Sequence, residues 1–249
     1  MDQPRPATLD SRALSASAAF VWLASAFGVL HPYYRASAAP YMDKLDLPSA
    51  LMYATCVVEA LIGLRVLVGP ANTWITVLQA ALIGTFTIIL VAVEPKLLVN
   101  PFGVLSKNLS MVAVILAAWL LEREGWTARV EWVLRAGLAF IWVWEGIFAN
   151  VVFQSDTLRG VIATARVPLD DPSLFLTIGG IGEALSGLAI LVLRGRLLRW
   201  LLIVQAFGLL VICVLVTNYD PLLWFHFAGP LTKNVPLIVG TLVLLRRHS

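Results

Sequence analysis

Three glutamates stand inside long apolar stretches of the sequence, where a carboxylate is hard to accommodate. Glu59, Glu145 and Glu183 each have apolar residues or glycine on both sides. A charged side chain at the centre of a bilayer costs about 3 kcal/mol on insertion scales, so such a group is neutral, paired or in a wet cavity. Two interpretations of Glu145 and Glu183 remain open. They form a proton-sharing or ligand-binding pair, or they are structural carboxyls, protonated or paired with Lys107 or Lys233.

The two lysines belong to a hydroxyl-Lys-Asn unit that occurs at 106–108 and again at 232–234. Each unit opens an apolar run, so Lys107 and Lys233 stand at the start of a helix and are followed by Asn108 and Asn234. A lysine at this position can simply extend to water, and the hydroxyl before it can cap the helix. The repetition keeps the alternative equally open, in which both pairs belong to an intramembrane polar site with the glutamates.

The unit ends a longer stretch that occurs twice, at 94–108 and 220–234, and the two copies align without a gap. An acid-Pro pair and a glycine recur in register, and we consider these residues a candidate outer-loop motif. Its members are Glu94, Pro95 and Gly103 in the first copy and Asp220, Pro221 and Gly229 in the second. A repeat of this kind predicts a duplicated architecture.

The two copies differ in their first apolar run. The second copy reads Trp142-Val143-Trp144-Glu145, and the first has Ser25 in the place of Glu145. The second copy therefore holds two intramembrane acids and the first holds one. Trp142 and Trp144 are candidate aromatic residues of a pocket, although aromatic residues in a span more often serve plain packing.

The elements that carry these residues are apolar runs of membrane-spanning length. The chain is 59% hydrophobic and 13% charged, against about 25% charged in soluble domains. A spanning helix needs about 20 apolar residues. The expected spans are 14–31, 48–69, 73–93, 105–121, 134–152, 173–193, 198–217 and 232–245. The sequence thus predicts an all-α polytopic membrane bundle of eight transmembrane helices, built as two four-helix repeats in parallel orientation.

The spans also define the domain organisation. We expect a polar tail over 1–13, the first repeat over 14–122, a charged linker over 123–132 and the second repeat over 133–249. Arg and Lys are more numerous on the side that holds both termini, which places the termini and the linker in the cytoplasm. Residues 31–46 are expected to form a loop, whose aromatic residues suit the membrane interface.

Other chemistries find little support. The histidines, His31, His226 and His248, fall outside the spans, so we expect no metal or haem site between helices. Cys56 and Cys213 stand alone inside spans and give no dithiol motif. No glycine-rich phosphate loop or cofactor motif is evident. The net charge of +3 is spread over the loops, so nucleic acid is not an expected partner.

Four motifs in order resemble the DoxX-like group of four-helix membrane proteins. In the second copy they are Trp142-x-Trp144-Glu145-Gly146, then Glu183-Ala184-Leu185-x-Gly187-Leu188, then Asp220-Pro221, then Gly229-Pro230-Leu231-Thr232-Lys233-Asn234. The first copy shows the resemblance more weakly. Two places depart from the group's pattern: Asn150 stands where a lysine often follows the first-helix acid, and Ser25 replaces that acid in the first copy.

The resemblance implies a subunit of the bacterial cytoplasmic (inner) membrane that is associated with redox chemistry. Our leading hypothesis is a non-catalytic component accessory to a quinone-linked or oxidative-stress system; as an enzyme, it would be a membrane subunit of a quinone-linked oxidoreductase. Quinone is the one cofactor that this hypothesis includes. The expected partners are the lipid bilayer and either a redox protein or a second copy of the chain, as a homo-oligomer. The alternatives are a small-molecule or ion transporter that uses the glutamates, and an isoprenoid- or lipid-binding module.

Overall fold

The chain folds entirely into helices over the residues that the computed structural model describes, namely 8–99, 103–165 and 171–248. The predicted all-α class is therefore confirmed for these residues. The first half contains α1 (Leu9–Gly28), α2 (Pro32–Lys44), α3 (Ser49–Val68), α4 (Thr73–Val93), the short 3-10 helix η1 (Pro95–Leu98) and α5 (Val104–Glu124). The second half contains α6 (Ala128–Trp144), the π-helix η2 (Glu145–Val152), α7 (Asp156–Thr164), α8 (Pro172–Val192), α9 (Gly195–Tyr219), the 3-10 helix η3 (Pro221–Phe225) and α10 (Asn234–Arg247).

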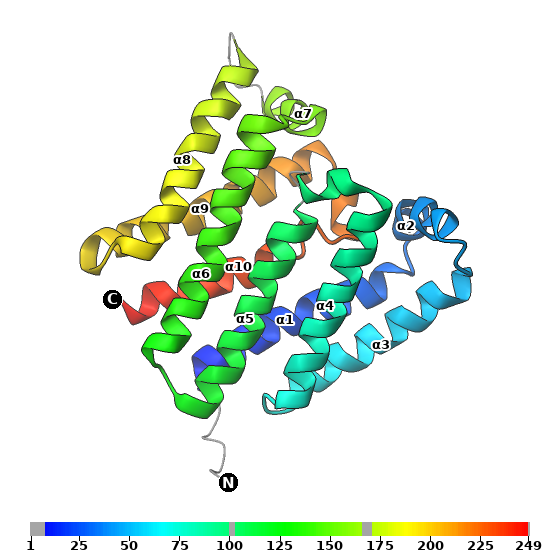
Figure 1. The fold of residues 1–249 in the computed structure, drawn as a ribbon, viewed down its shortest axis with the longest axis horizontal. Coiled ribbons are helices and arrows are strands. Elements are labelled where there is room, and N and C mark those ends of the chain that lie inside the picture. Colours follow the sequence, from blue (N-terminus) through cyan, green and yellow to red (C-terminus); the bar gives the residue numbers. More distant parts are fainter. Residues whose placement is uncertain (1–7, 100–102, 166–170, 249) are drawn as a thin grey trace.

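With α6 and η2 counted as one continuous helix, the order of elements is the same in the two halves, as the sequence repeat predicts. A long helix is followed by a short one, then by two long helices, a 3-10 turn and a last helix. The α1, α5, α6 and α10 helices pack together in the middle of the molecule. Figure 1 shows α2, α3 and α4 on one side of this centre and α7, α8 and α9 on the other. Each half therefore contributes two helices to the centre and the rest to one flank.

Three helices extend into segments that the sequence predicts as tail and linker. The α1 helix begins at Leu9 because the Thr8 hydroxyl accepts a hydrogen bond from the Ser11 N–H (3.2 Å). Helical structure thus replaces the end of the expected 1–13 tail, and residues 1–7 lie outside the described residues. Similarly, α5 continues to Glu124 and α6 begins at Ala128, so most of the expected 123–132 linker is helical.

The expected loop over 31–46 is wrong, because this segment forms the α2 helix. Pro32 at the first position has a backbone angle suited to a helix start. His31 caps the helix, since its Nδ1 accepts a hydrogen bond from the Tyr33 N–H (3.2 Å). The α2 helix is bent by 86° from α1. It contacts α4 and η3 and covers a cavity.

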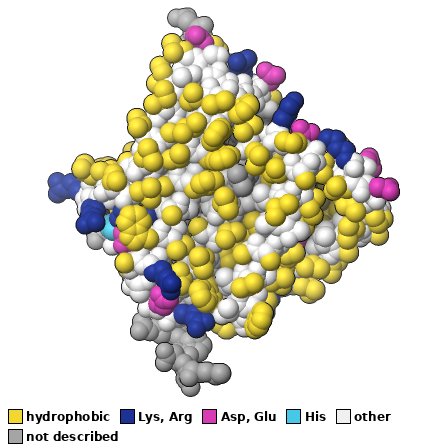
Figure 2. Space-filling view, in the orientation of Figure 1, with side chains coloured by type: hydrophobic (Ala, Val, Ile, Leu, Met, Phe, Trp, Pro, Cys, Tyr) yellow, Lys and Arg dark blue, Asp and Glu magenta, His cyan; other side chains and the backbone are white. Residues whose placement is uncertain are grey.

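The surface of the long helices is apolar, as a membrane protein requires. Figure 2 shows hydrophobic side chains over most of the visible face, with charged side chains gathered along its edges. Among the described residues, five helices are long and apolar enough to cross a membrane, namely α3, α4, the continuous α6–η2, α8 and α9. There are six if the bent pair of α1 and α2 counts as one span. The chain is thus a multi-pass membrane protein. By length and composition, eight spans are not confirmed, although each predicted run is largely helical.

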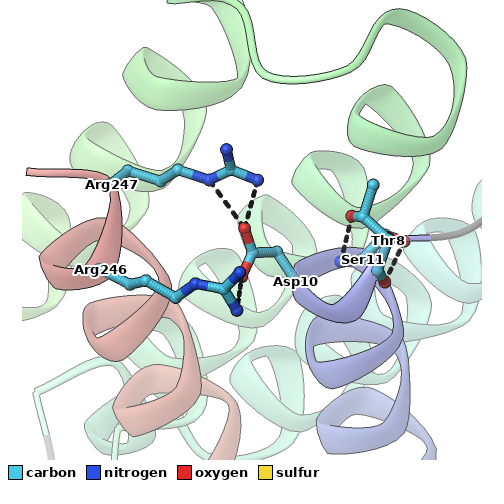
Figure 3. A network of polar contacts seen from close by, with 5 residues as sticks. All are labelled: Thr8, Asp10, Ser11, Arg246 and Arg247. Atoms are coloured by element: carbon cyan, nitrogen blue, oxygen red, sulfur yellow. Dashed lines mark hydrogen bonds and ion pairs between the residues drawn. The ribbon is translucent and has the colours of Figure 1, made fainter.

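An ion cluster joins the two ends of the described chain. The Asp10 carboxylate at the start of α1 accepts a hydrogen bond from Arg247 Nε (2.7 Å) and pairs with Arg246 Nη1 (3.1 Å), both at the end of α10. Figure 3 shows the two guanidinium groups converging on Asp10. The cluster holds the first helix of the first half against the last helix of the second.

Candidate functional site

A cavity of about 290 Å³ lies inside the first half, between α3, α4 and α5 and beneath α2. Most of its wall is apolar, with Ile83, Phe86 and Met111 among the lining residues. Glu59 of α3 and Lys233 at the start of α10 bring one carboxylate and one ammonium group into this space. We call it the first cavity.

Glu59 is the least satisfied polar group of the first cavity. Its side chain is 7% exposed, and its Oε2 has no hydrogen-bond partner among the described residues. The nearby Lys233 interacts with it electrostatically. A buried carboxylate oxygen without a partner costs about 1–3 kcal/mol or more, so this oxygen is placed to accept a hydrogen bond from a ligand or a water molecule.

A second cavity of about 280 Å³ lies inside the second half, between η2, α8 and α9. Glu145 and Glu183 both line it, together with Lys107 from the first half. Ser106 Oγ donates a hydrogen bond to Glu145 Oε1 (2.9 Å), and Asn150 Nδ2 donates one to Glu183 Oε2 (2.6 Å). The structure therefore brings the two predicted acids together, and they interact electrostatically.

The local backbone places Glu145 at the edge of this cavity. Glu145 begins η2, where α6 widens into a π-helix. Such turns occur frequently at functional sites. Gly146 and Gly180 let η2 and α8 approach closely, since a Cβ on Gly146 would lie 2.5 Å from the Gly180 carbonyl oxygen. A side chain at either glycine would push the two acidic helices apart.

The Lys-Asn pairs are divided between the two cavities. Asn108 lines the cavity of its own half, whereas the preceding Lys107 lines the cavity of the other half, and Asn234 and Lys233 show the same division. This follows from the central position of α5 and α10, which lie between the cavities. Each lysine is held by a carbonyl of the same loop: Lys107 Nζ donates to Pro230 O (2.7 Å) and Lys233 Nζ to Ala228 O (2.6 Å).

The placement of each lysine in the cavity of the other half bears on its two interpretations, namely extension to water or membership of an intramembrane polar site. Lys107 is 5% exposed, so it does not extend to water. It interacts electrostatically with Glu145, as Lys233 does with Glu59. In each cavity a lysine from one half of the chain thus acts electrostatically on a carboxyl group from the other half.

The outer-loop motif forms the turn that positions each lysine. Pro95 and Pro221 open η1 and η3. Gly103 (φ 50°) and Gly229 (φ 60°) adopt the left-handed conformation that favours glycine. A Cβ on Gly103 would also collide with the Glu145 carboxylate. These four residues therefore act through the backbone, and none of them requires a chemical role.

The acids of the motif serve different purposes in the two copies. Asp220 Oδ1 accepts a hydrogen bond from the Leu222 N–H (3.0 Å) and so caps η3. Glu94 makes no such cap and instead pairs with Lys44 of α2 (3.2 Å). Neither acid lines a cavity. Their place is at the outer surface of the molecule.

The candidate pocket aromatics lie in different surroundings. Trp142 lines the second cavity. Trp144 lines neither cavity; its Nε1 donates to Leu98 O (2.7 Å), and its ring packs between Phe140 and Phe148. Trp144 thus serves packing between α6 and η1.

Sequence reasoning missed the residues that cover the first cavity. Tyr34 and Tyr41 of α2 line it from above, next to Phe225, His226 and Phe227 of the second half. Burial, together with the nearby Lys233 ammonium, lowers the pKa of His226 to about 4. The aromatic steps near 31–46 gave a signal for this cover, but they were interpreted as an interfacial loop.

Metal binding finds no support in the described part of the chain, where no group of three or more His, Cys, Asp or Glu side chains is placed to hold an ion. The comparison with protein families identifies a known family. The model described as the DoxX-like family matches the chain twice, over residues 19–116 and 139–242. The match confirms the resemblance seen in the motifs and is consistent with a tandem duplication. No curated protein and no solved structure matches the chain.

Proposed function

Because the chain belongs to the DoxX-like family, we propose that it is a membrane component without catalysis of its own, which binds a small amphipathic molecule in the first cavity. The proposed ligand carries a polar head with hydroxyl or carbonyl groups, as a quinone does, on an apolar body or an isoprenoid tail. In this role the protein is accessory to a quinone-linked redox or oxidative-stress system.

The observation that carries the proposal is the unpartnered Oε2 of Glu59, a residue that lines an apolar cavity together with Lys233. Ligand sites are typically apolar concavities with a few polar groups that fix orientation. The carboxylate accepts a hydrogen bond from a ligand hydroxyl, and the ammonium donates one to a ligand carbonyl. The charges of these two side chains offset each other, which favours a neutral ligand.

The walls of the cavity support entry from the lipid. Leu51 of α3 and Ile89 of α4 line the cavity and are also exposed on the apolar surface. The space between α3 and α4 thus connects the cavity with the bilayer. A molecule dissolved in the membrane can enter there, head group first, and leave its tail between the two helices.

The proposal includes a membrane topology. We place the chain in a bacterial cytoplasmic (inner) membrane with both termini in the cytoplasm and with eight crossings, in which α1, α5 and α10 also span. The joining of Asp10 to Arg246 and Arg247 supports a common side for the two termini. The arginines near the ends of α5, α6, α9 and α10 favour the cytoplasm for that side. A reporter fused after Ser249 that is active only outside the cell would contradict this orientation.

Native mass spectrometry tests the binding proposal. The protein is extracted in native lipid discs, and retained small molecules and associated proteins are identified. We expect a quinone or isoprenoid at a stoichiometry near one, lost in Glu59→Gln and reduced in Lys233→Gln. Glu124→Gln, which removes a carboxylate in a surface ion pair with Arg129, should retain the ligand. Bulk lipid alone in the wild type would overturn the proposal. If the molecule is retained but no oxidoreductase is extracted with the protein, the binding proposal stands and the accessory role in a redox system is contradicted.

A transporter is the second candidate, favoured by the two cavities on either side of the central helices. Lys107 and Lys233 interact electrostatically across this centre. Parallel repeats with acids near the midplane occur in transporters. Flux in reconstituted vesicles that is abolished by Glu145→Gln with Glu183→Gln would support this function, and the absence of flux for candidate ions and amphipaths would count against it.

A further inference from the structure

We propose that the second cavity is a binding site for a small organic cation of the primary-ammonium class, held between Glu145 and Glu183. This inference concerns a different cavity and a ligand of different charge from the proposed function, and it does not depend on it.

The charges that face the two cavities are unequal. The first cavity has the Glu59 carboxylate opposite the Lys233 ammonium, whereas the second has two carboxylates opposite the single ammonium of Lys107. The polar groups added around the second cavity, the Ser106 hydroxyl and the Asn150 amide, are neutral donors to the acids. With both acids ionised, a cation that enters this space supplies the second positive charge and makes the site neutral.

Two polar atoms in the wall of the second cavity also lack partners among the described residues. Asn234 is 1% exposed, and its Oδ1 accepts no hydrogen bond; Trp142 is 8% exposed, and its Nε1 donates none. Both residues line the cavity. Buried polar groups are nearly always hydrogen-bonded, to protein or to an ordered molecule, so the wall of the cavity contains one acceptor and one donor whose hydrogen bonds are unmade among the described residues.

The first half shows that the free indole donor is not a property of the fold. There, Trp22 Nε1 donates a hydrogen bond to Gln79 Oε1 (2.9 Å), and both groups are satisfied. The equivalent residues of the second half are Trp142 and Gln205, and neither Trp142 Nε1 nor Gln205 Oε1 has a partner among the described residues. Gln205 instead donates to Ser186. The second half therefore lacks the Trp–Gln hydrogen bond of the first half, and the indole N–H of the tryptophan that lines its acidic cavity has no acceptor in the described part of the chain.

The size and the access of the cavity define the ligand further. A cavity of about 150 Å³ binds benzene, so the volume of about 280 Å³ holds one aromatic ring with a short aminoalkyl chain. Phe175 of α8 and Ile212 of α9 line the cavity and are exposed on the apolar surface. The ligand can therefore reach the site through the bilayer between α8 and α9, with its ring on the apolar wall and its ammonium group at the acids.

The experiment uses phenethylammonium as the probe and phenethyl alcohol as its neutral counterpart. Binding to the full-length protein in lipid discs is measured by calorimetry at neutral pH. We expect the ammonium compound to bind at least about tenfold more tightly than the alcohol, because only the ammonium is attracted by the carboxylates. Glu183→Gln should weaken binding of the ammonium by about tenfold or more and should leave binding of the alcohol unchanged.

The second part of the experiment uses a variant that should bind phenethylammonium more tightly. A misfolded protein could not produce such a gain in affinity. Lys107→Gln removes the opposing charge and retains a donor for the Pro230 carbonyl, so it should tighten binding of phenethylammonium by about threefold or more. Glu124→Gln is the matched control and should bind as the wild type does. Equal binding of the ammonium and the alcohol, an unchanged affinity in Glu183→Gln, weaker binding in Lys107→Gln, or no binding at all would each overturn the proposal.

Discussion

The ion cluster between the two ends of the chain permits a stability test with a single substitution, Asp10→Asn. It should destabilise the wild type and stabilise a variant that lacks the two arginines. The Asp10 side chain is 3% exposed, whereas those of Arg246 and Arg247 are 57% and 32% exposed. Water can therefore reach both guanidinium groups but hardly reaches the carboxylate. An arginine that loses the acid turns to solvent, while an aspartate that loses its arginines remains buried with an uncompensated charge.

These exposures set the expected free energies of unfolding. Asp10→Asn removes charge-assisted hydrogen bonds and should cost about 2 kcal/mol. Arg246→Gln combined with Arg247→Gln leaves a buried unpaired carboxylate and should cost about 3–5 kcal/mol. Adding Asp10→Asn to that double variant removes the unpaired charge, so the triple variant should regain about 1–3 kcal/mol. The aspartate substitution thus destabilises the wild type and stabilises the double variant.

Steric trapping in lipid bicelles measures the free energy of unfolding of the four proteins. Arg129→Gln is the control, because the Arg129–Glu124 pair is exposed and should contribute less than about 1 kcal/mol. If Asp10→Asn lowers stability by a similar amount in both backgrounds, the aspartate is not a buried charge held by the two arginines, and the argument from exposure is refuted.

Three further predictions follow from the cavities and their cover. Trp22→Phe breaks the hydrogen bond to a glutamine of α4, so it should cost about 1–2 kcal/mol more than Trp142→Phe; equal losses in thermal unfolding would contradict the difference between the halves. Gly103→Ala and Gly229→Ala both strain a left-handed turn, but only the first places a methyl group against a cavity carboxylate, and we expect it to be costlier by about 1–3 kcal/mol. Because the pKa of His226 is lowered to about 4, the unfolded chain binds more protons between that value and about 6.5, and stability should fall as the pH decreases through this window. Unfolding measured across this pH range should lose that slope in His226→Gln, and an unchanged slope would exclude the histidine as its source.

The duplicated helical plan could be predicted because it depends on local sequence. Apolar runs of spanning length, and a stretch that recurs over 94–108 and 220–234, require no knowledge of tertiary contacts. The residues singled out as an intramembrane polar site do line the two cavities. These residues could be recognised from the sequence, because an acid or a lysine inside an apolar run makes membrane insertion less favourable and is usually kept for a function.

The assignment of partners could not be predicted, because it depends on how the halves pack. Nothing in the unit at 106–108 indicates that Lys107 faces the other half while Asn108 faces its own. The division arises only when α5 lies between the cavities. The α2 helix was missed for a related reason: its composition resembles an interfacial loop, and its helical form depends on the His31 cap and on packing above the first cavity.

The most direct test of the account is an experimental structure of the protein in native lipid discs, with attention to the density around Glu59. The account predicts an elongated density whose head contacts the Glu59 carboxylate and the Lys233 ammonium and whose tail leaves between α3 and α4. It also predicts that Lys107 faces Glu145 of the other half. A first cavity that contains only water, or a Lys107 turned toward the Glu59 of its own half, would contradict the central claim.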